Sequence, residues 1–424
     1  MTPLERKFRD QTPGSEALFR QARAFLPGGL TRSTLHVEPY PLALASGSGA
    51  TVADVDGNAY IDLVNNYTAL VHGNAHPETL RAIGEQFALG TALASPHASQ
   101  IRLAELIVER IPSIELVRFT NSGSEATTLA VRITRRATGR RKLVMFEGGY
   151  HGTGIPLADA DQDVVTIPYN DEAAAREAIS DQVAAVFAEP FLGAGGVIPG
   201  DRGFLSSVQE RCREVGALFV LDEIQSLRNG VGGAQTEQGL RPDVTLLGKV
   251  IGGGLPVGAV GGRRDLMALT DATRSQALAH SGTTNGHLGS MAAGVVTLEL
   301  LTEDAIGLLH TRAARLAASI ESSGAAAGLP VTVTRAGSIM NVHFSAHGPR
   351  TYREAAGMGT PLLRELYLGL LGHGAYTTPR GMINLSTVLS DVQLARVEEA
   401  YGRVLADIAG RTDLVTAEIT ADVR

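Results

Sequence analysis

From about residue 115 onward, short apolar runs alternate with longer segments whose apolar positions recur at helical spacing. The runs are rich in Val, Leu and Phe at successive positions, which is typical of strands buried on both faces between helices. Strands separated by helices form βαβ units, so the pattern predicts an α/β fold with a mostly parallel sheet. Its ligands are expected beyond the carboxyl ends of the strands. The predicted strands are residues 115–119, 142–146, 183–189, 217–223, 243–248 and 256–260.

The two ends of the chain have a different pattern. Residues 36–64 contain alternating segments on either side of a hairpin-turn signal, Asp-Gly-Asn, at 56–58. After about residue 300, a long helical pattern precedes short apolar segments. This pattern predicts a smaller α+β domain built from both chain ends. We therefore expect an N-terminal segment of the small domain at 1–60, a large domain at 61–304 and the rest of the small domain at 305–424.

The composition is that of an ordinary globular protein, with 44% hydrophobic and 19% charged residues among 424. The formal net charge of −7 argues against a nucleic-acid partner, because such proteins normally carry a basic surface. The single cysteine, Cys212, excludes an internal disulfide and a zinc site built from several thiolates. We expect a cytoplasmic protein without a membrane partner, because neither a secretory signal nor an apolar run of bilayer length is visible.

A strand-to-helix turn lies at residues 118–126, where Ser122, Gly123 and Ser124 follow a buried run. Free backbone N–H groups, the helix dipole and two hydroxyls at such a turn can bind an anion such as a phosphate. The alternative is an ordinary N-cap, with Ser124 as the capping residue.

Lys249 is one of three lysines in the chain and stands in a glycine tract after the predicted strand 243–248. A nucleotide P-loop does not fit, because Asp243 occupies the place of its first glycine and Val250 that of its hydroxyl residue. Apolar neighbours on both sides predict a partly desolvated lysine. Such a lysine has a lowered pKa and can act as an amine nucleophile that forms a Schiff base.

Asp222 ends the apolar run one strand earlier. A carboxylate at the end of a buried strand needs a cationic or hydrogen-bonding partner, and a protonated heterocyclic nitrogen would serve. A helix cap or a metal ligand are the alternatives, and no second carboxylate or histidine stands at metal-ligand spacing. The adjacent Glu223 is interpreted as turned away from the site.

Two further loops could contact a ligand. Residues 147–152 contain glycines and Tyr150, whose ring offers a flat face, although a tight turn with a half-exposed tyrosine is the alternative. Residues 280–290 are rich in glycine and hydroxyls, which suits anion contact or simply a loop. The sequence has neither the G-x-S-x-G elbow of serine hydrolases nor the H-E-x-x-H pattern of zinc proteases.

Together, a phosphate cradle, an aromatic face, a carboxylate for a ring nitrogen and a nucleophilic lysine are the groups that pyridoxal 5'-phosphate requires. The order of these segments resembles the class III aminotransferases of fold type I over essentially the whole chain. Within that class the chain is most similar to the glutamate-1-semialdehyde aminomutase-like branch, and there to the β-amino acid (3-aminocarboxylate) transaminases. The matching segments are NSGSEA, GGYHG, LDEIQ, PDVTLLGKVIGGGLPVGAVGG and HSGTTN.

This resemblance implies a large domain that holds pyridoxal phosphate, with Lys249 in Schiff-base linkage to it and Asp222 paired with its ring nitrogen. The freed lysine amine would then act as the general base, while Asp222 keeps the ring able to accept electrons. The resemblance also implies an obligate homodimer with shared active sites, in which Thr283 reaches the phosphate of the partner subunit. The other cofactor-binding residues that it implies are Ser122, Gly123, Ser124, Tyr150 and Gln225.

Arg32 and Arg380 match positions that bind carboxylates in the β-amino acid transaminases, and arginine suits bidentate carboxylate binding. The alternative is that both are ordinary surface arginines. The sequence departs from the β-transaminase pattern after Asp222, where Gln225 resembles other class III members, and also after Thr283. These departures concern the substrate and leave the cofactor prediction unchanged.

The function that follows is transfer of an amino group from a β-amino acid, or a related amino acid, to a keto acid such as 2-oxoglutarate or pyruvate by a ping-pong mechanism. An aminomutase or amino-acid racemase on the same scaffold is the alternative, and it would need no keto-acid co-substrate. A non-catalytic protein with this fold is a rival of another class. An NAD-dependent enzyme lacks support, because the dinucleotide glycine fingerprint is missing.

Overall fold

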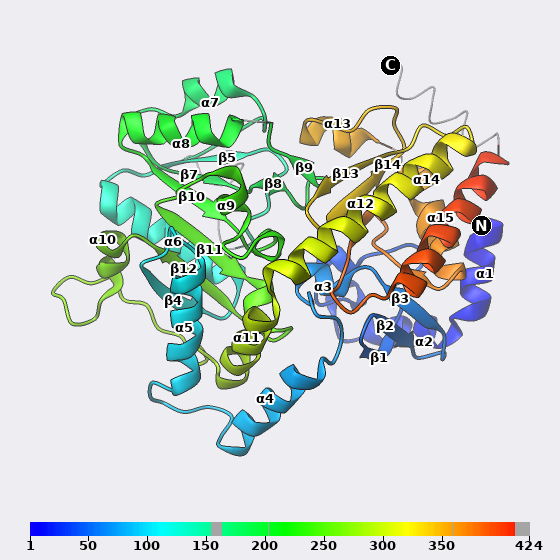
Figure 1. Cartoon of the computed structure of the whole chain (residues 1–424), viewed down its shortest axis with the longest axis horizontal. Helices are drawn as coiled ribbons and strands as arrows, with labels where there is room; N and C mark the ends of the chain where they lie inside the picture. Colours follow the sequence, from blue (N-terminus) through cyan, green and yellow to red (C-terminus); the bar gives the residue numbers. More distant parts are fainter. Residues whose placement is uncertain (154–162, 202, 359, 412–424) are drawn as a thin grey trace.

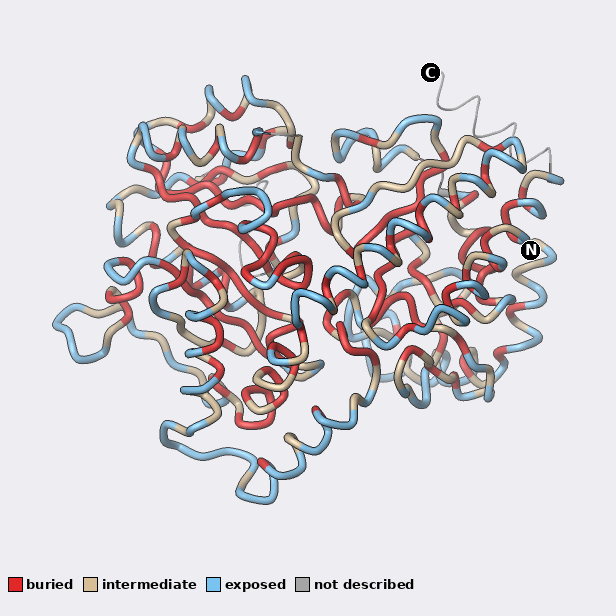
Figure 2. Tube along the Cα trace, in the orientation of Figure 1, coloured by how far each residue is buried: buried red, intermediate tan, exposed pale blue. Residues whose placement is uncertain are grey.

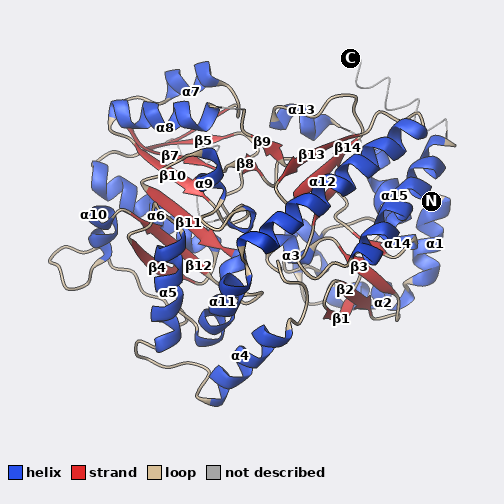
Figure 3. Cartoon of the chain, in the orientation of Figure 1, coloured by secondary structure: helices blue, strands red, loops and turns tan. Residues whose placement is uncertain are grey.

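The computed structural model describes residues 1–153, 163–201, 203–358 and 360–411. Its largest element is a seven-stranded sheet with the order β4-β12-β11-β10-β7-β5-β6 (Figures 1 and 3). All neighbouring strands are parallel except β12, which runs antiparallel to both β11 and β4. The strands are β4 (Leu116–Thr120), β5 (Lys142–Phe146), β6 (Val164–Ile167), β7 (Val183–Ala188), β10 (Leu218–Asp222), β11 (Val244–Gly248) and β12 (Gly258–Gly262).

The predicted α/β class with a mostly parallel sheet is confirmed, with two differences. The segment predicted at 256–260 forms β12, whose direction is reversed because only residues 249–257 connect it to β11. A parallel partner would need a crossover of a dozen residues or more. The edge strand β6 was not predicted, because its two central residues are exposed and it lacks a continuous apolar run.

Helices cover both faces of this sheet, which explains why its central strands are apolar throughout (Figure 2). Val186 and Phe219 pack with helix α8 (Phe204–Val215) on one face. The alternate positions Phe187 and Val220 pack with α6 (Gly123–Thr138) on the other face. Side chains of a strand alternate between the two faces, so every position of β7 and β10 is buried.

Both chain ends contribute to the smaller sheets. The predicted hairpin at 56–58 joins β2 to β3, and β15 adds parallel to β3 from the far end of the chain. A four-stranded sheet has the order β1-β2-β3-β15 and a three-stranded sheet the order β13-β14-β16, while β8 and β9 pair separately. These strands are β1 (Leu44–Ser48), β2 (Thr51–Asp54), β3 (Ala59–Asp62), β8 (Phe191–Leu192), β9 (Ile198–Pro199), β13 (Thr332–Ala336), β14 (Ile339–His343), β15 (Ala375–Tyr376) and β16 (Met382–Asn384).

The predicted helix after residue 300 is α12 (Glu303–Ala326), which packs against α15 (Asp391–Ala409) and β13 and extends from the middle of the molecule to the upper right in Figure 1. Within the described residues, no helix combines the length and the apolar character that crossing a bilayer requires. The remaining helices are α1 (Pro3–Gln11), α2 (Pro13–Ala22), α3 (Asn65–Thr68), α4 (Pro77–Ala88), α5 (Ala98–Arg110), α7 (Glu172–Ala178), α9 (Ala234–Gln238), α10 (Arg264–Met267), α11 (Leu288–Leu300), α13 (Tyr352–Gly357) and α14 (Thr360–Gly372).

Candidate active site

Lys249 follows β11 directly and begins the short 3₁₀ turn Lys249–Gly252. Its φ of 48° is in the left-handed region, which is uncommon for a residue with a side chain and is found at functional sites. Burial lowers the pKa of the Lys249 amine, although the carboxylates of Asp222 and Glu189 oppose that shift. The Lys249 amine therefore loses its proton, and becomes nucleophilic, more readily than the amine of a solvated lysine.

Asp222 lies at the carboxyl end of β10, which pairs with β11, and its Cα partner there is Leu246. The carboxylate is buried. Oδ1 accepts a hydrogen bond from the backbone N–H of Ile224 at 3.0 Å, and Oδ2 lies 2.8 Å from Nδ1 of His151. Asp222 is therefore held in one orientation at the strand end that also leads to Lys249.

His151 is a buried partner of Asp222 that the sequence did not reveal as a site residue. Burial by itself lowers the pKa of the imidazole, but the hydrogen bond to Asp222 and the charges of Asp222 and Glu189 outweigh it, so the pKa is raised. The Nδ1–H then donates to the carboxylate, and this places a positive charge next to Asp222. The signal for this residue was its place beside Tyr150 in the loop after β5.

Glu189 is a second buried carboxyl group that was not predicted, and it directly follows β7. Its Oε2 accepts a hydrogen bond from the backbone N–H of Tyr150 at 3.0 Å, and its Oε1 one from Gly193 at 3.3 Å. Burial raises the pKa of Glu189 to about 7, against the opposing charge of His151. The group thus fixes the loop that carries Tyr150.

The strand-to-helix turn forms between β4 and α6. Ser122 is the N-cap and accepts from the backbone N–H of Glu125 at 3.2 Å, so the N-cap of the alternative interpretation is present, but its capping residue is Ser122 and not Ser124. The Ser124 hydroxyl instead accepts from the backbone N–H of Thr153 at 3.1 Å. The turn is also packed tightly, because a Cβ on Gly123 would lie 2.6 Å from Cδ1 of Ile224.

A cavity of about 280 Å³ opens beside this turn and is lined by Ser124, Thr153 and the guanidinium-bearing Arg132, among other residues. Helix N-terminal N–H groups that face a cavity bind anions well, because the helix dipole adds to their partial positive charge. The turn therefore has the groups and the space for a phosphate.

The other predicted cofactor residues occupy different environments. Tyr150 is 47% exposed, so its ring is free to cover a ligand. Oε1 of Gln225 is buried and has no hydrogen-bond partner among the described residues, which leaves an acceptor for a ligand hydroxyl. Thr283 is exposed, while the next residue, Thr284, donates to Asn121 at 2.8 Å.

Glu223 points away from this site, as the sequence interpretation held. Its carboxylate accepts hydrogen bonds from the backbone N–H groups of Ala234 and Gln235 at the start of α9, and from the Ser226 hydroxyl. It stabilises the loop after Asp222 and is not available to a ligand.

The two predicted substrate arginines both act on Tyr67. The Arg32 guanidinium carbon lies 5.7 Å from the centroid of the Tyr67 ring, and its Nη1 donates to Oδ1 of Asn66 at 3.1 Å. Burial raises the pKa of the Tyr67 phenol, and the positive charges of Arg380 and Arg32 both oppose this increase. Two exposed guanidinium groups therefore lie near one phenol ring.

The described residues fit pyridoxal phosphate on three grounds: a partly desolvated amine, a fixed buried carboxylate with a cationic neighbour, and an unpartnered acceptor on Gln225. They fit a metal poorly, because the described part of the chain has no cluster of three histidine, cysteine or carboxylate side chains.

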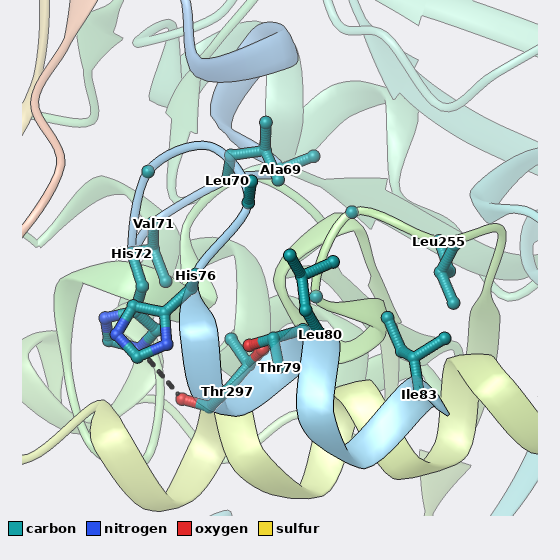
Figure 4. Close-up of a pocket in the computed structure, with 14 residues that line it drawn as sticks. Ala69, Leu70, Val71, His72, His76, Thr79, Leu80, Ile83, Leu255 and Thr297 are labelled. Atoms are coloured by element: carbon teal, nitrogen blue, oxygen red, sulfur yellow. Dashed lines mark hydrogen bonds between the residues drawn. The ribbon is translucent and has the colours of Figure 1, made fainter. Parts of the chain in front are cut away.

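A separate cavity of about 210 Å³ lies between α4, α11 and the glycine tract after Lys249 (Figure 4). Its lining includes Gly253, Gly254 and His72, whose Nε2 is 3.0 Å from the carbonyl oxygen of Thr297. Burial lowers the pKa of His72 to about 4, so this ring is neutral and Nε2 donates. None of the predicted site residues lines this cavity, so it is distinct from the candidate active site.

A family model, aminotransferase class-III, matches residues 33–389, and the chain belongs to this family. The chain is 40% identical to a beta-phenylalanine transaminase of Variovorax paradoxus, over 94% of each sequence. A solved structure of a beta-phenylalanine aminotransferase from that organism superposes with a TM-score of 0.92, at 38% identity over 96% of this chain and 97% of the other.

Two further relatives define the range of the similarity. A glutamate-1-semialdehyde 2,1-aminomutase of Anaeromyxobacter dehalogenans is 38% identical over 94% of this chain and 99% of the relative. A solved transaminase with bound PLP has a TM-score of 0.87 and 33% identity, over 94% of this chain and 98% of the other. Family membership supports the predicted class III transaminase, fold type I architecture and pyridoxal phosphate cofactor.

Proposed function

We propose that this aminotransferase takes the amino group of a β-amino acid and passes it to a keto acid such as 2-oxoglutarate or pyruvate in a ping-pong reaction. The observation that carries this proposal is the pair of exposed guanidinium groups, Arg32 and Arg380, around Tyr67. Arginine binds carboxylates through two parallel hydrogen bonds, and both the donor and the acceptor of this reaction carry a carboxylate. The similarity to a beta-phenylalanine transaminase supports the same substrate class.

When bound, pyridoxal phosphate supplies a carbonyl that receives the amino group and a ring that accepts electrons. Lys249 would hold the cofactor covalently, and its free amine would move a proton at the substrate carbon. Asp222, held by His151, would serve as the partner of a protonated ring nitrogen. Ser122, Gly123 and Ser124 would hold the phosphate, while Tyr150 and Gln225 would contact the cofactor ring and its hydroxyl.

We also propose a homodimer in which Thr283 completes the phosphate site of the partner subunit. Support comes from exposed apolar side chains on α4, in the segment that follows it and on α5, since exposed apolar surface often marks protein interfaces. These are Leu80, Leu89, Leu93 and Ile101, which are 53%, 73%, 50% and 57% exposed. Residues 61–304 form the proposed cofactor-binding domain, and 1–60 with 305–424 the small domain. A cytoplasmic location stays a prediction.

The second candidate is an aminomutase, which the glutamate-1-semialdehyde aminomutase relative favours. An aminomutase would convert a single substrate without a keto acid. The two functions can therefore be separated by the requirement for a co-substrate.

The test is a donor screen of α-, β- and ω-amines against pyruvate and 2-oxoglutarate, with keto-acid product measured. The proposal predicts that β-amino acids are used best and that no turnover occurs without a keto acid. Product formation from one substrate alone would favour the aminomutase, and preference for amines that lack a carboxylate would contradict the assigned substrate class.

A further inference from the structure

Arg228 is a fully buried arginine that the proposed reaction does not use. It lies in the 3₁₀ turn Leu227–Asn229, six residues after Asp222 on the loop that leaves β10. Burial lowers the pKa of its guanidinium to about 9, so the group is still charged at neutral pH. A charge is costly to bury, and its environment must therefore compensate for the lost water.

The compensation comes from neutral oxygens. Nε donates to the hydroxyl of Ser338 at 3.2 Å, and Nη1 donates to Oδ1 of Asn384 at 3.1 Å and, more weakly, to the carbonyl of Thr68 at 3.5 Å. Nη2 donates to the carbonyl of Leu385. No carboxylate within the described ranges of the chain forms an ion pair with Arg228, so its donors serve geometry rather than charge neutralisation.

These partners come from segments that are far apart in the sequence. Thr68 ends α3, Ser338 lies in the turn between β13 and β14, and Asn384 ends β16. Arg228 therefore connects the loop after β10 to the α3 segment, which follows β3, and to the sheet of β13, β14 and β16. A planar guanidinium with five donors can do this, while the single ammonium of lysine cannot reach the same set of oxygens.

The network continues to the segment that carries the contacts of Arg32. The side-chain amide of Asn384 donates to the backbone carbonyl of Val64 at 2.8 Å. The backbone carbonyl of Asn384 accepts from the Asn65 side chain at 2.8 Å. Residues 65–68 all have positive φ angles, between 46° and 75°. Such a run of non-glycine residues is strained and persists only when its surroundings hold it. Asn66 and Tyr67, the partners of Arg32, lie within it.

The same network reaches the turn that carries Arg380. Gly381 donates to the carbonyl of Thr378 at 3.2 Å, and the Thr378 hydroxyl donates to the carbonyl of Met382 at 2.9 Å, which closes this turn onto β16. Asn384, the partner of Arg228, ends that short strand. One buried guanidinium thus fixes the bases of both loops that present Arg32 and Arg380.

We propose that Arg228 is a positioning residue for carboxylate recognition, which it controls by holding residues 64–68 and 382–385 in register with the loop after Asp222. The inference rests on the proposed function, because Arg32 and Arg380 recognise the carboxylate there. Removing Arg228 lets the strained segment relax, so the two surface arginines lose their common geometry. The amine chemistry at Lys249 is unaffected, since none of these contacts involves it.

The experiment compares holoenzyme variants Arg228→Gln and Arg228→Lys with the wild type. The matched control is Arg110→Gln, because Arg110 also donates to backbone carbonyls, at Val231, Leu298 and Leu301, but contacts neither loop. The readouts are kcat and KM for a β-amino acid and for an amine without a carboxylate, the Kd of 3-phenylpropanoate by calorimetry, and hydrogen exchange of residues 64–70.

We expect Arg228→Gln to raise KM for the β-amino acid and the Kd of 3-phenylpropanoate by about tenfold, with kcat nearly unchanged, as loss of uniform binding predicts. The kcat and KM for the amine without a carboxylate should change by less than about twofold. Amide hydrogen exchange of residues 64–70 should accelerate. Arg228→Lys should give a smaller effect of the same kind. Arg110→Gln should lower thermal stability without changing the donor preference.

An equal loss on both donors, or unchanged carboxylate binding, would overturn the inference. If Arg228→Gln does not fold, Arg228→Lys takes its place in the test. Wild-type kcat and KM for both donors in Arg228→Lys would then overturn the inference. A wild type that uses no β-amino acid refutes the proposed function itself, and the inference with it. If the wild type prefers β-amino acids and the Arg228 variant keeps the same donor preference, the inference is refuted and the proposed function stands.

Discussion

Nδ1 of His151 lies 2.8 Å from Oδ2 of Asp222, and both side chains are buried at the carboxyl end of the central sheet. A buried carboxylate is stable there because a cationic imidazole faces it, and the imidazole keeps its proton because the carboxylate faces it. The pair therefore holds the Asp222 carboxylate in a fixed orientation beside a positive charge.

This pair predicts a pH-dependent stability. The pKa of His151 in the folded protein is raised above its ordinary value of 6.5, so its contribution is complete below that pH and is lost as the pH rises through the raised value. His151→Gln removes the contribution. The difference in free energy of unfolding between wild type and variant should shrink as the pH rises above about 6.5 and through the raised pKa of His151, as measured by urea unfolding. A constant difference would contradict the ion pair.

Lys249→Ala tests the covalent role of the lysine. We expect kcat to fall at least about a hundredfold, because the variant would lose both the proposed covalent anchor and the proposed general base. Borohydride treatment should leave no cofactor on the protein after denaturation. The matched control is Lys142→Ala, since Lys142 is exposed and its Nζ donates to Oε1 of Gln182 at 2.7 Å. A label that persists in Lys249→Ala would assign the anchor to another residue.

Much of the central sheet could be predicted because β7, β10 and β11 are buried on both faces and therefore read as unbroken apolar runs. The direction of β12 does not follow from periodicity, which carries no information on strand orientation, but from the short connection 249–257, which is too short for a parallel crossover. The edge strand β6 is half exposed and lacks that pattern.

The same limit applies to the site. Lys249 and Asp222 stand out as single charges at the ends of apolar runs. His151 and Glu189 gain their roles from the order of strands in the sheet, in which β7 lies between β5 and β10. The hydrogen-bond partners of Arg228 lie in segments more than a hundred residues away in the sequence. Spatial neighbours of this kind are set by tertiary structure.

Arg380→Ala should weaken the use of β-amino donors selectively. One charge-assisted hydrogen-bonded contact contributes roughly 1.5–3 kcal/mol, so kcat/KM should fall about 10- to 100-fold for a β-amino acid. For an amine without a carboxylate, kcat/KM should fall by less than about threefold. Arg396→Ala, an exposed arginine on α15, is the control and should behave as wild type. Equal losses on both donors would remove Arg380 from carboxylate binding.

Gly258→Ala should weaken cofactor binding from the opposite side of the phosphate turn. A Cβ on Gly258 would lie 2.1 Å from the carbonyl oxygen of Ser122, a contact with backbone that no side-chain rotation relieves. The displaced turn should raise the Kd of pyridoxal phosphate about tenfold or more in titrations of apoprotein, since on the proposed assignment several N–H groups of the turn would share the phosphate. Gly307→Ala is the control, because a Cβ there contacts nothing within 4 Å. In the α12 helix it should stabilise the protein by about 0.5–1 kcal/mol.

Glu189→Gln separates a second pH dependence from that of His151. Burial raises the pKa of Glu189 from 4.5 to about 7, so the folded protein binds its proton more tightly than the unfolded chain does. The resulting contribution to the free energy of unfolding is complete below about pH 4.5 and disappears as the pH rises through about 7. It amounts to about 3 kcal/mol. Glutamine is neutral throughout, and its amide oxygen can replace only one of the two carboxylate acceptors, so the variant also loses a hydrogen bond to Tyr150 or Gly193. That loss does not depend on pH. In urea unfolding between about pH 4.5 and 7, wild type should lose stability more steeply than Glu189→Gln, whereas parallel curves would show that Glu189 is ionised throughout.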